Sequence, residues 1–259
     1  MKNLLVFCLL GLLPAITSAE TPEEKGLAIA VEADARDKGF GDSIAGMEMI
    51  LRNRQGDESR REVRVRTLEV EADGDKSLSI FDAPADVKGT AFLTFSHVTG
   101  LDDQWLYLPS LKRVKRISSK NKSGPFMGSE FAYEDISSDE VEKYSYRYLR
   151  DEVYEGMECF VIERRPVDPN SGYTRQEVWI DKQEYRPQRV VYYDRKDSLL
   201  KTLTFHEYRQ YLDKFWRAQR MEMLNHQTGK STTLSWGDYR FRSGLTDRDF
   251  DQSSLKRAR

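Results

Sequence analysis

Residues that could carry out catalytic or metal chemistry are few in this chain and lie far apart. Three histidines are present, His97, His206 and His226, and none has the spacing to another histidine or to Cys159 that zinc sites use. The sequence has no Gly-x-Ser-x-Gly nucleophile turn and no glycine-rich phosphate loop. We therefore expect no catalytic residue, no metal site and no cofactor, and a protein that is not an enzyme.

Cys159 is the one cysteine outside the N-terminal apolar run, so an internal disulfide is not expected. It lies in the alternating stretch 157–162, where every second residue is apolar. This pattern favours a small buried hydrophobic residue over a reactive nucleophile.

A basic run, Lys112-Arg113-Val114-Lys115-Arg116, is the next chemical feature. Lysine and arginine on a solvated strand edge prevent edge-to-edge pairing, which is one interpretation. The other is a contact with anionic lipid head groups or with an acidic partner, made by Lys112, Arg113, Lys115 and Arg116. The chain has 41 Lys and Arg against 43 Asp and Glu, so its net charge does not point to nucleic acid.

The stretch 104–133 combines an aromatic-rich hairpin with a Ser- and Gly-rich loop that contains Pro125-Phe126-Met127-Gly128. Large apolar side chains in such a loop are expected to cover something apolar. We hypothesise that this turn belongs to a mobile lid, with Phe126 and Met127 as apolar plugs. The alternative is that the two side chains only pin a long loop to the core.

The elements that position these residues are one helix and many short strands. Thr21, Pro22 and Glu23-Glu24 are typical of a helix start, and Gly39 of its end. Beyond Gly41 the apolar residues recur at period two, which indicates strands joined by polar turns in one antiparallel meander. The predicted strands lie around 47–51 and 63–65 and at 76–82, 91–97, 104–109, 112–117, 144–154, 157–165, 173–181, 187–194, 199–212, 215–225 and 230–241.

The two faces of this sheet differ along the chain. In 104–109 both faces are apolar, so we expect this strand to be covered on both sides, whereas the arginine-rich 61–66 is covered on one. A strongly curved sheet around a partly apolar interior, with a small helical cap, fits this mixture. The residues expected to line that interior or its lid are apolar: Met47, Met49, Leu51, Val63, Val65, Leu93, Phe95, Trp105, Tyr107, Phe126 and Met127.

Residues 1–19 have the layout of a secretory signal peptide that is cleaved after Ala19. One lysine precedes an apolar run too short to span a bilayer, and small residues stand at Thr17 and Ala19. An uncleaved membrane anchor is the alternative. We expect residues 20–259 to form a single exported domain with no stable membrane span after cleavage, periplasmic in a cell with two membranes.

Several long motifs resemble one known family. They include Ala83-Pro84-Ala85-Asp86-Val87-Lys88-Gly89-Thr90, Asp103 to Pro109, Phe126-Met127-Gly128-Ser129, Asp168-Pro169-Asn170-Ser171-Gly172-Tyr173 and Asn225 to Ser231. These motifs resemble the LolA-like outer-membrane lipoprotein-sorting proteins, in the subfamily associated with exporters of the RND (MMPL) type. The resemblance extends over about residues 40–250.

The resemblance implies the LolA/LolB-like fold, an incomplete antiparallel β-barrel with a few helices that cover a hydrophobic cavity. It also implies a periplasmic carrier or chaperone whose partners are lipid or lipoprotein acyl chains, with an RND/MMPL-type inner-membrane exporter as a further partner. LolA itself uses a buried arginine that helps to hold its lid closed, and no motif here places an equivalent. The alternative function is an accessory module of such an exporter that carries nothing.

Overall fold

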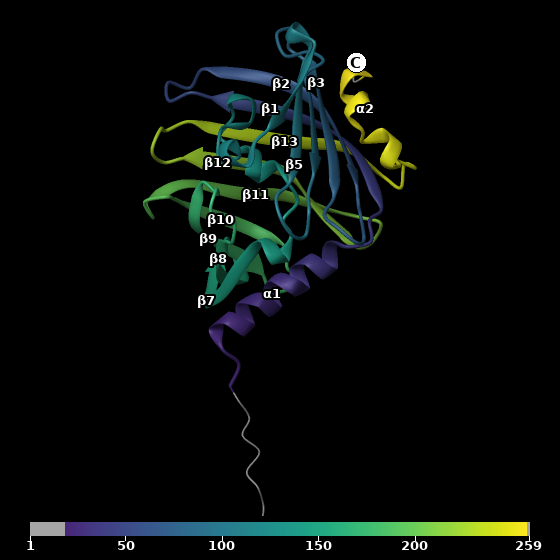
Figure 1. Ribbon diagram of the computed structural model, residues 1–259. Helices are drawn as coiled ribbons and strands as arrows, with labels where there is room; N and C mark the ends of the chain where they lie inside the picture. Colours follow the sequence, from purple (N-terminus) through teal and green to yellow (C-terminus); the bar gives the residue numbers. More distant parts are fainter. Residues whose placement is uncertain (1–18, 258–259) are drawn as a thin grey trace, which may run out of the picture.

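One antiparallel sheet of thirteen strands forms the frame of the protein (Figure 1). The computed structural model describes residues 19–257, so residues 1–18 of the predicted signal peptide lie outside the described part. Every region predicted as a strand contains one, which confirms the mainly β fold class. The strands are β1 (Asp42–Arg52), β2 (Glu58–Leu68), β3 (Lys76–Ala83), β4 (Ala91–Phe95), β5 (Asp103–Leu108), β6 (Arg113–Ile117), β7 (Tyr144–Tyr154), β8 (Met157–Pro166), β9 (Tyr173–Asp181), β10 (Pro187–Asp194), β11 (Leu199–Tyr211), β12 (Phe215–Asn225) and β13 (Ser231–Phe241).

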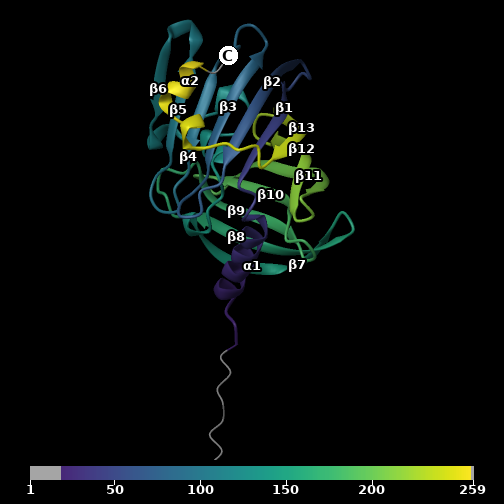
Figure 2. The same ribbon diagram turned by 90° about the vertical axis from the view of Figure 1, so that its right-hand side faces the viewer.

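The sheet consists of two meanders that meet where β1 pairs with β13. Strands β1 to β6 follow one another on one side of this pair, and β13 back to β7 on the other, so β6 and β7 are the two edges. The sheet curves strongly but is not closed (Figure 1, Figure 2). Residues 118–143, here called the crossing segment, connect the two edges through the inside of the curve. Short 3-10 helices occur in this segment and at two other turns: η1 (Pro109–Leu111), η2 (Ser119–Asn121), η3 (Phe126–Gly128), η4 (Tyr133–Ile136), η5 (Val141–Lys143) and η6 (Asp247–Asp249).

The first helix, α1 (Pro22–Asp37), forms where the sequence predicts it. Thr21 and Glu24 cap it reciprocally, because the Glu24 backbone N–H donates to Thr21 Oγ1 (3.2 Å) and the Thr21 N–H to Glu24 Oε2 (2.8 Å). The helix approaches β7 closely at Gly26, where a β-carbon would lie 2.7 Å from the backbone of Arg147. It therefore covers the β7 end of the concave face (Figure 1). Within residues 19–257, no helix is long and apolar enough to cross a membrane.

The main core lies on the concave face and joins both meanders through the crossing segment. Phe126 packs against Phe92 of β4 and Phe81 of β3, with ring centroids 5.0 Å and 6.0 Å apart. Tyr133 lies 5.4 Å from Phe92, and Phe131 is buried in the same cluster. Burying one such ring fully stabilises the fold by about 1.5–3 kcal/mol. The crossing segment thus fills the concave face of the first meander.

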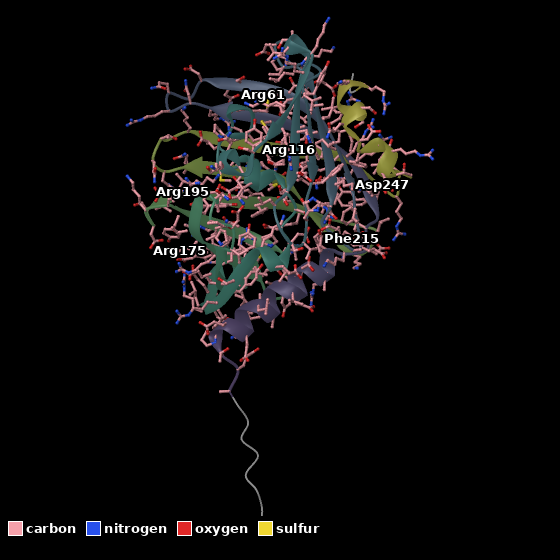
Figure 3. All side chains as sticks on the ribbon, in the orientation of Figure 1. Arg61, Arg116, Arg175, Arg195, Phe215 and Asp247 are labelled. Carbon is pink, nitrogen blue, oxygen red and sulfur yellow. The ribbon has the colours of Figure 1, made fainter. Side chains whose placement is uncertain are left out.

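Residues 245–257 cover the convex face of β3–β5 (Figure 2). After β13 the chain runs to α2 (Gln252–Arg257), and it inserts Phe250 and Leu255, which are 1% and 0% exposed, into a second apolar cluster. Lys76 on β3 and Asp247 form an ion pair at 2.5 Å that ties the segment down; Asp247 is labelled in Figure 3. Because of this cover, β3–β5 are buried on both faces, as predicted for 104–109.

Candidate functional site

A cavity of about 1120 Å³ lies between α1, the crossing segment and the concave faces of β8–β12. Helix α1 contributes Ala30 and Ala33, whose small side chains keep the helix from filling the space. The sheet side is apolar because alternate residues of five strands point inward. The apolar side chains of this wall are Ile162, Val178, Ile180, Val190, Leu203, Phe205 and Met221.

Aromatic rings with polar tips form much of the remaining lining. Tyr173 and Tyr192 lie side by side with ring centroids 4.9 Å apart. Burial raises the pKa of Tyr208 and of Tyr239 above the ordinary tyrosine value, so both hydroxyls stay protonated and can donate hydrogen bonds. The lining is therefore amphipathic, with apolar ring faces and a few hydroxyl groups. Besides Phe205, its aromatic members are Phe40, Phe131, Tyr144, Tyr146, Tyr173, Tyr185, Tyr192, Tyr208, Trp216, Trp236 and Tyr239.

A buried ion pair fastens the crossing segment to the second meander. Lys201 Nζ of β11 lies 2.6 Å from Asp135 Oδ2 of η4, and the two side chains are 4% and 7% exposed. Asp135 also accepts hydrogen bonds from Tyr173 Oη (2.9 Å) and from the backbone N–H of Ala132 (2.7 Å). Lys201 Nζ donates to the Glu130 carbonyl as well (2.9 Å). Both charges are thus satisfied by hydrogen bonds, as a buried pair requires.

Arg61 fastens the same segment to the first meander. It lies opposite Met49 in the pairing of β2 with β1, hence on the concave face, and its guanidinium donates to the carbonyl oxygen of Met127 (Figure 3). Burial lowers the pKa of Arg61, and within the described part of the chain no carboxylate forms an ion pair with it. Sequence motifs did not identify this arginine. The alternation with Val63 and Val65 was the available signal, because it places Arg61 on the apolar face.

The sequence motifs did not identify Lys201 or Arg164 either. The alternation of residues along their strands would have placed both on apolar faces. Lys201 shares a strand face with Leu203 and Phe205, and Arg164 of β8 shares one with Ile162. Arg164 lines the cavity, where it donates to Asp139 Oδ2 (2.7 Å) and lies over the ring of Tyr144 (4.4 Å). A charged residue on the same strand face as apolar residues therefore indicates a buried polar contact in this protein.

Phe126 and Met127 lie inside the molecule but do not line the cavity. Phe126 is 1% exposed and packs on the first meander, as described above. Met127 has φ 50°, a left-handed conformation that strains a non-glycine residue, and Gly128 follows with φ 78°. The structure places this turn as a plug in one half of the concave face, beside the half that contains the cavity.

The predicted orientation of four residues is wrong. Leu93, Phe95, Trp105 and Tyr107 belong to the convex cluster beneath the C-terminal segment, whereas Leu106 belongs to the concave core. Side chains alternate along a strand, so both faces of an apolar strand cannot point to one cavity. The sequence of 104–109 is apolar on both faces and gives no basis for choosing between them. The cover that decides the question comes from the far end of the chain.

The other predicted residues lie on the concave face, as expected. Met47 and Met49 of β1 and Val63 of β2 belong to the concave core, and Leu51 and Val65 pack against it. None of these five side chains lines the cavity, because the crossing segment covers the first meander. Their role as lipid contacts stays a prediction.

The predicted basic residues lie at the free edge of the first meander. Lys112, Arg113, Lys115 and Arg116 are all exposed, on β6 and the turn before it. Arg116 (Figure 3) forms an ion pair with Asp103 of the neighbouring strand. The edge is thus solvated and basic, and its contact with head groups or a partner stays a prediction.

Part of the cavity lining is acidic. Most of its acidic residues come from the end of α1, the β2–β3 turn, residues 137–141 and the β11–β12 turn. Asp75 and Glu140 lie among these residues, and Glu140 is only 8% exposed. Burial first, and then the charge of Glu140, raise the pKa of Asp75 to about 7. Two carboxyl groups that repel each other therefore belong to the cavity lining.

Cys159 is fully buried on the convex side, as its sequence pattern predicts. Burial raises the pKa of its thiol to about 11, which leaves it protonated and unreactive near neutral pH. His97 does not itself line the cavity, but its Nδ1 lies 2.6 Å from Oδ2 of Asp73, which does. Across residues 19–257, no three His, Cys, Asp or Glu side chains are grouped to hold a metal ion.

The chain is similar to several known proteins. A family model described as an uncharacterized protein matches residues 73–257. A domain from Vibrio parahaemolyticus named for outer membrane lipoprotein sorting has a similar structure, with 64% identity over 90% of this chain and 99% of that chain, and a TM-score of 0.89. No curated protein matches the chain.

Two further solved structures share the fold. A DUF1329 family protein from Desulfovibrio piger is 33% identical, over 91% of this chain and 99% of that one, with a TM-score of 0.86. A LolA superfamily protein from Nitrosomonas europaea is 21% identical, over 88% and 98% of the two chains, with a TM-score of 0.72. The second likeness concerns the fold alone.

Proposed function

Because the chain belongs to the LolA-like family of outer-membrane lipoprotein-sorting proteins, we propose that it is a periplasmic carrier for the acyl chains of lipids or lipoproteins. The observation that carries this proposal is the cavity of about 1120 Å³ between α1 and the concave sheet. Its volume is slightly larger than the usual range for small-molecule sites, about 300–1,000 Å³, and leaves room for a long acyl chain. Its deep wall is apolar, which suits a hydrocarbon chain.

The energetics of such a carrier require a cover that can move. Burying an acyl chain gains about 0.8 kcal/mol per CH₂ group, so one long chain gains on the order of 10 kcal/mol. Release then depends on a partner or a membrane that favours the open form. In this proposal the cover consists of α1 and the crossing segment, the latter held by Lys201 and Arg61. The turn with Phe126 and Met127 would leave its position only if the crossing segment withdraws as a whole.

Two alanines on α1 provide a matched test of the carrier function. Ala33 lines the cavity, whereas Ala35 is exposed on the same helix. We expect Ala33→Trp to fill the cavity and weaken binding of a fluorescent fatty acid at least about tenfold, which corresponds to about 1.4 kcal/mol. Ala35→Trp should bind as the unchanged protein does. Equal binding by both variants would exclude this cavity as the acyl site.

An accessory module of an RND/MMPL-type exporter is the second candidate, and the exposed basic edge at β6 is the feature that favours it. Native mass spectrometry of protein isolated from the periplasm separates the two functions. A carrier should retain lipid, and the Ala33→Trp variant should retain less of it. A module that carries nothing should give lipid-free spectra and lose exporter binding when Lys112, Arg113 and Lys115 are replaced together.

A further inference from the structure

One hydrogen-bond donor of the cavity lining has no acceptor. Among the residues that the structure describes, three buried side-chain polar atoms lack a hydrogen-bond partner, and Nε1 of Trp236 is the only one of them in the lining. An indole N–H can donate but cannot accept, so only an acceptor group satisfies it. Leaving it enclosed and unpaired costs free energy that an acceptor would recover. The wall at Trp236 therefore favours a ligand that carries such a group.

A second donor lies next to this indole. Trp236 lies on the concave face of β13, opposite Met47 of β1, where the two meanders meet. Tyr239 of the same strand stacks on it, with ring centroids 6.0 Å apart and ring planes at 26°. Tyr239 also lines the cavity, and within residues 19–257 no group forms a hydrogen bond with its hydroxyl. The strand thus presents two neighbouring donors, one N–H and one O–H, without an acceptor.

Other aromatic donors of the lining do have acceptors within the protein. The indole N–H of Trp216 donates to Glu184 Oε2 (3.2 Å). The hydroxyl of Tyr208 donates to the carbonyl oxygen of Pro187. The fold thus provides oxygen atoms for donors elsewhere in the same wall. Trp236 differs from Trp216 in this respect alone that matters for binding: its N–H is still available to a ligand.

The charges of the lining favour a neutral acceptor over an anion. The lining contains six lysine and arginine side chains, and each of them already contacts a carboxylate or a carbonyl oxygen of the protein. Arg164 with Asp139 (2.7 Å) and Arg186 with Asp181 (2.9 Å) are examples. A carboxylate or phosphate that entered would break one of these contacts or remain without a cation, and both cost free energy. A carbonyl oxygen is neutral and has two lone pairs, enough for an N–H and an O–H together.

We propose that Trp236 and Tyr239 bind the carbonyl oxygen of an ester- or amide-linked acyl chain whose hydrocarbon tail lies along the apolar wall. This inference rests on the proposed carrier function and names the chemical group by which the cargo is recognised. Because Nε1 is enclosed by its neighbours, the indole turns toward the cavity as the ligand enters. Side-chain rotations of this kind are common on binding. Trp236 then gains the acceptor that the protein does not provide.

The test compares three amphiphiles that share one tail: methyl dodecanoate, dodecyl methyl ether and dodecanoate. The ether differs from the ester only by a CH₂ group in place of the carbonyl. Each is used, below the concentration at which it aggregates, to displace N-phenylnaphthylamine, an apolar fluorescent probe, from the full chain. At about pH 8, where a carboxylic acid is ionised, we expect the ester to displace the probe at a concentration at least about tenfold below that of dodecanoate.

Two variants and a control locate the contact. Trp236→Phe keeps an aromatic ring and removes the donor, so it should lower the affinity for the ester, measured relative to the ether, about fivefold or more. Tyr239→Phe should lower the same ratio. Trp216→Phe changes the lining in the same way but removes an N–H that Glu184 already accepts, so the ratio should stay as in the unchanged protein. Binding of the ether shows that each variant is folded, and an unchanged ratio in Trp236→Phe overturns the proposal.

A spectroscopic measurement on the unchanged protein tests the same contact directly. The chain has four tryptophans, so ¹⁵N-labelled tryptophan gives four indole N–H signals. The signal of Trp236 is the one that is absent from the spectrum of Trp236→Phe. The ester should move its proton resonance downfield, because the N–H gains an acceptor, whereas the ether should not. A Trp236 signal that responds equally to both ligands contradicts the proposed contact.

The outcomes separate the inference from the function on which it rests. If neither the ester nor the ether displaces the probe, the carrier function fails and the inference fails with it. If both displace it but the Trp236 signal and the ester-to-ether ratio do not respond, the carrier stands and the proposed carbonyl contact is wrong. If dodecanoate binds as tightly as the ester, the carrier stands and the preference for a neutral acceptor is wrong.

Discussion

Lys201 illustrates how much a single side chain determines here. It lies beside the adjacent rings of Tyr173 and Tyr192, with Nζ 5.1 Å from each centroid, and it binds Asp135 of the crossing segment. Lysine is rarely this buried unless it is paired. The position of the crossing segment, and with it one wall of the cavity, depends on this contact.

Lys201→Met should lower the free energy of unfolding by about 3–5 kcal/mol, because it leaves Asp135 buried without its cation. Adding Asp135→Asn should recover part of the loss, since the uncompensated charge disappears. Lys182→Met, which breaks the more exposed pair with Asp151, should lower the free energy of unfolding far less, because solvent screens that pair. Urea unfolding of the four proteins measures these differences, and equal effects at the two lysines would contradict the buried-pair argument.

Asp75 should lower stability as the pH rises. Its pKa is about 7 in the folded chain and about 4 in the unfolded one, so between these values the folded state retains a proton that the unfolded state has lost. Stability therefore decreases with pH through this window. Asp75→Asn should raise the free energy of unfolding by about 1–3 kcal/mol near pH 8 and change it little near pH 4.

The control for this pH dependence is Asp238→Asn, at an exposed position, which should shift the free energy of unfolding by less than about 0.5 kcal/mol at either pH. A gain for Asp75→Asn that does not vary with pH would show that titration is not its cause.

At the scale of elements, the sequence predicted the strands but not the segments that pack against the two faces of the sheet. Period two and polar turns place β7 to β13 almost residue by residue, because these signals are local. The convex cover of β5 comes instead from Phe250 and Leu255, far along the chain, and no local pattern connects them to Trp105. The sequence predicted a hydrophobic cavity but not its position, since the cavity lies between α1 and strands that begin more than a hundred residues later.

The C-terminal segment should be essential for stability although it lies outside the cavity. Phe250→Ala removes a buried ring from the convex cluster, and we expect a loss of about 3–5 kcal/mol in the free energy of unfolding. Lys256→Ala, at an exposed position of the same segment, should be close to neutral. The affinity for the apolar probe should be unchanged in folded Phe250→Ala, and a large change in it would connect this segment to the cavity.

For the molecule as a whole, ligand binding should slow hydrogen exchange in the half that contains the cavity and leave it unchanged in the other half. The cavity is bounded by the second meander, α1 and the later part of the crossing segment, whereas the first meander is already filled by Phe126. Hydrogen exchange with bound amphiphile should therefore slow in 131–146 and in the C-terminal half of α1, and stay the same in β1–β4. Slower exchange centred on 125–128 would instead support the lid hypothesis for that turn.

The pairing of β1 with β13 has a consequence for how the chain folds. The two strands come from opposite ends of the domain, so the sheet cannot be completed until the last strand has been made, and the long loop between them must be closed at an entropic cost. Until then the free side of β1, with Met47 and Met49, is an unpaired and apolar edge. A chain made from its N-terminus therefore exposes this edge to pairing with other chains until β13 has been made, and it is most prone to aggregate during that interval.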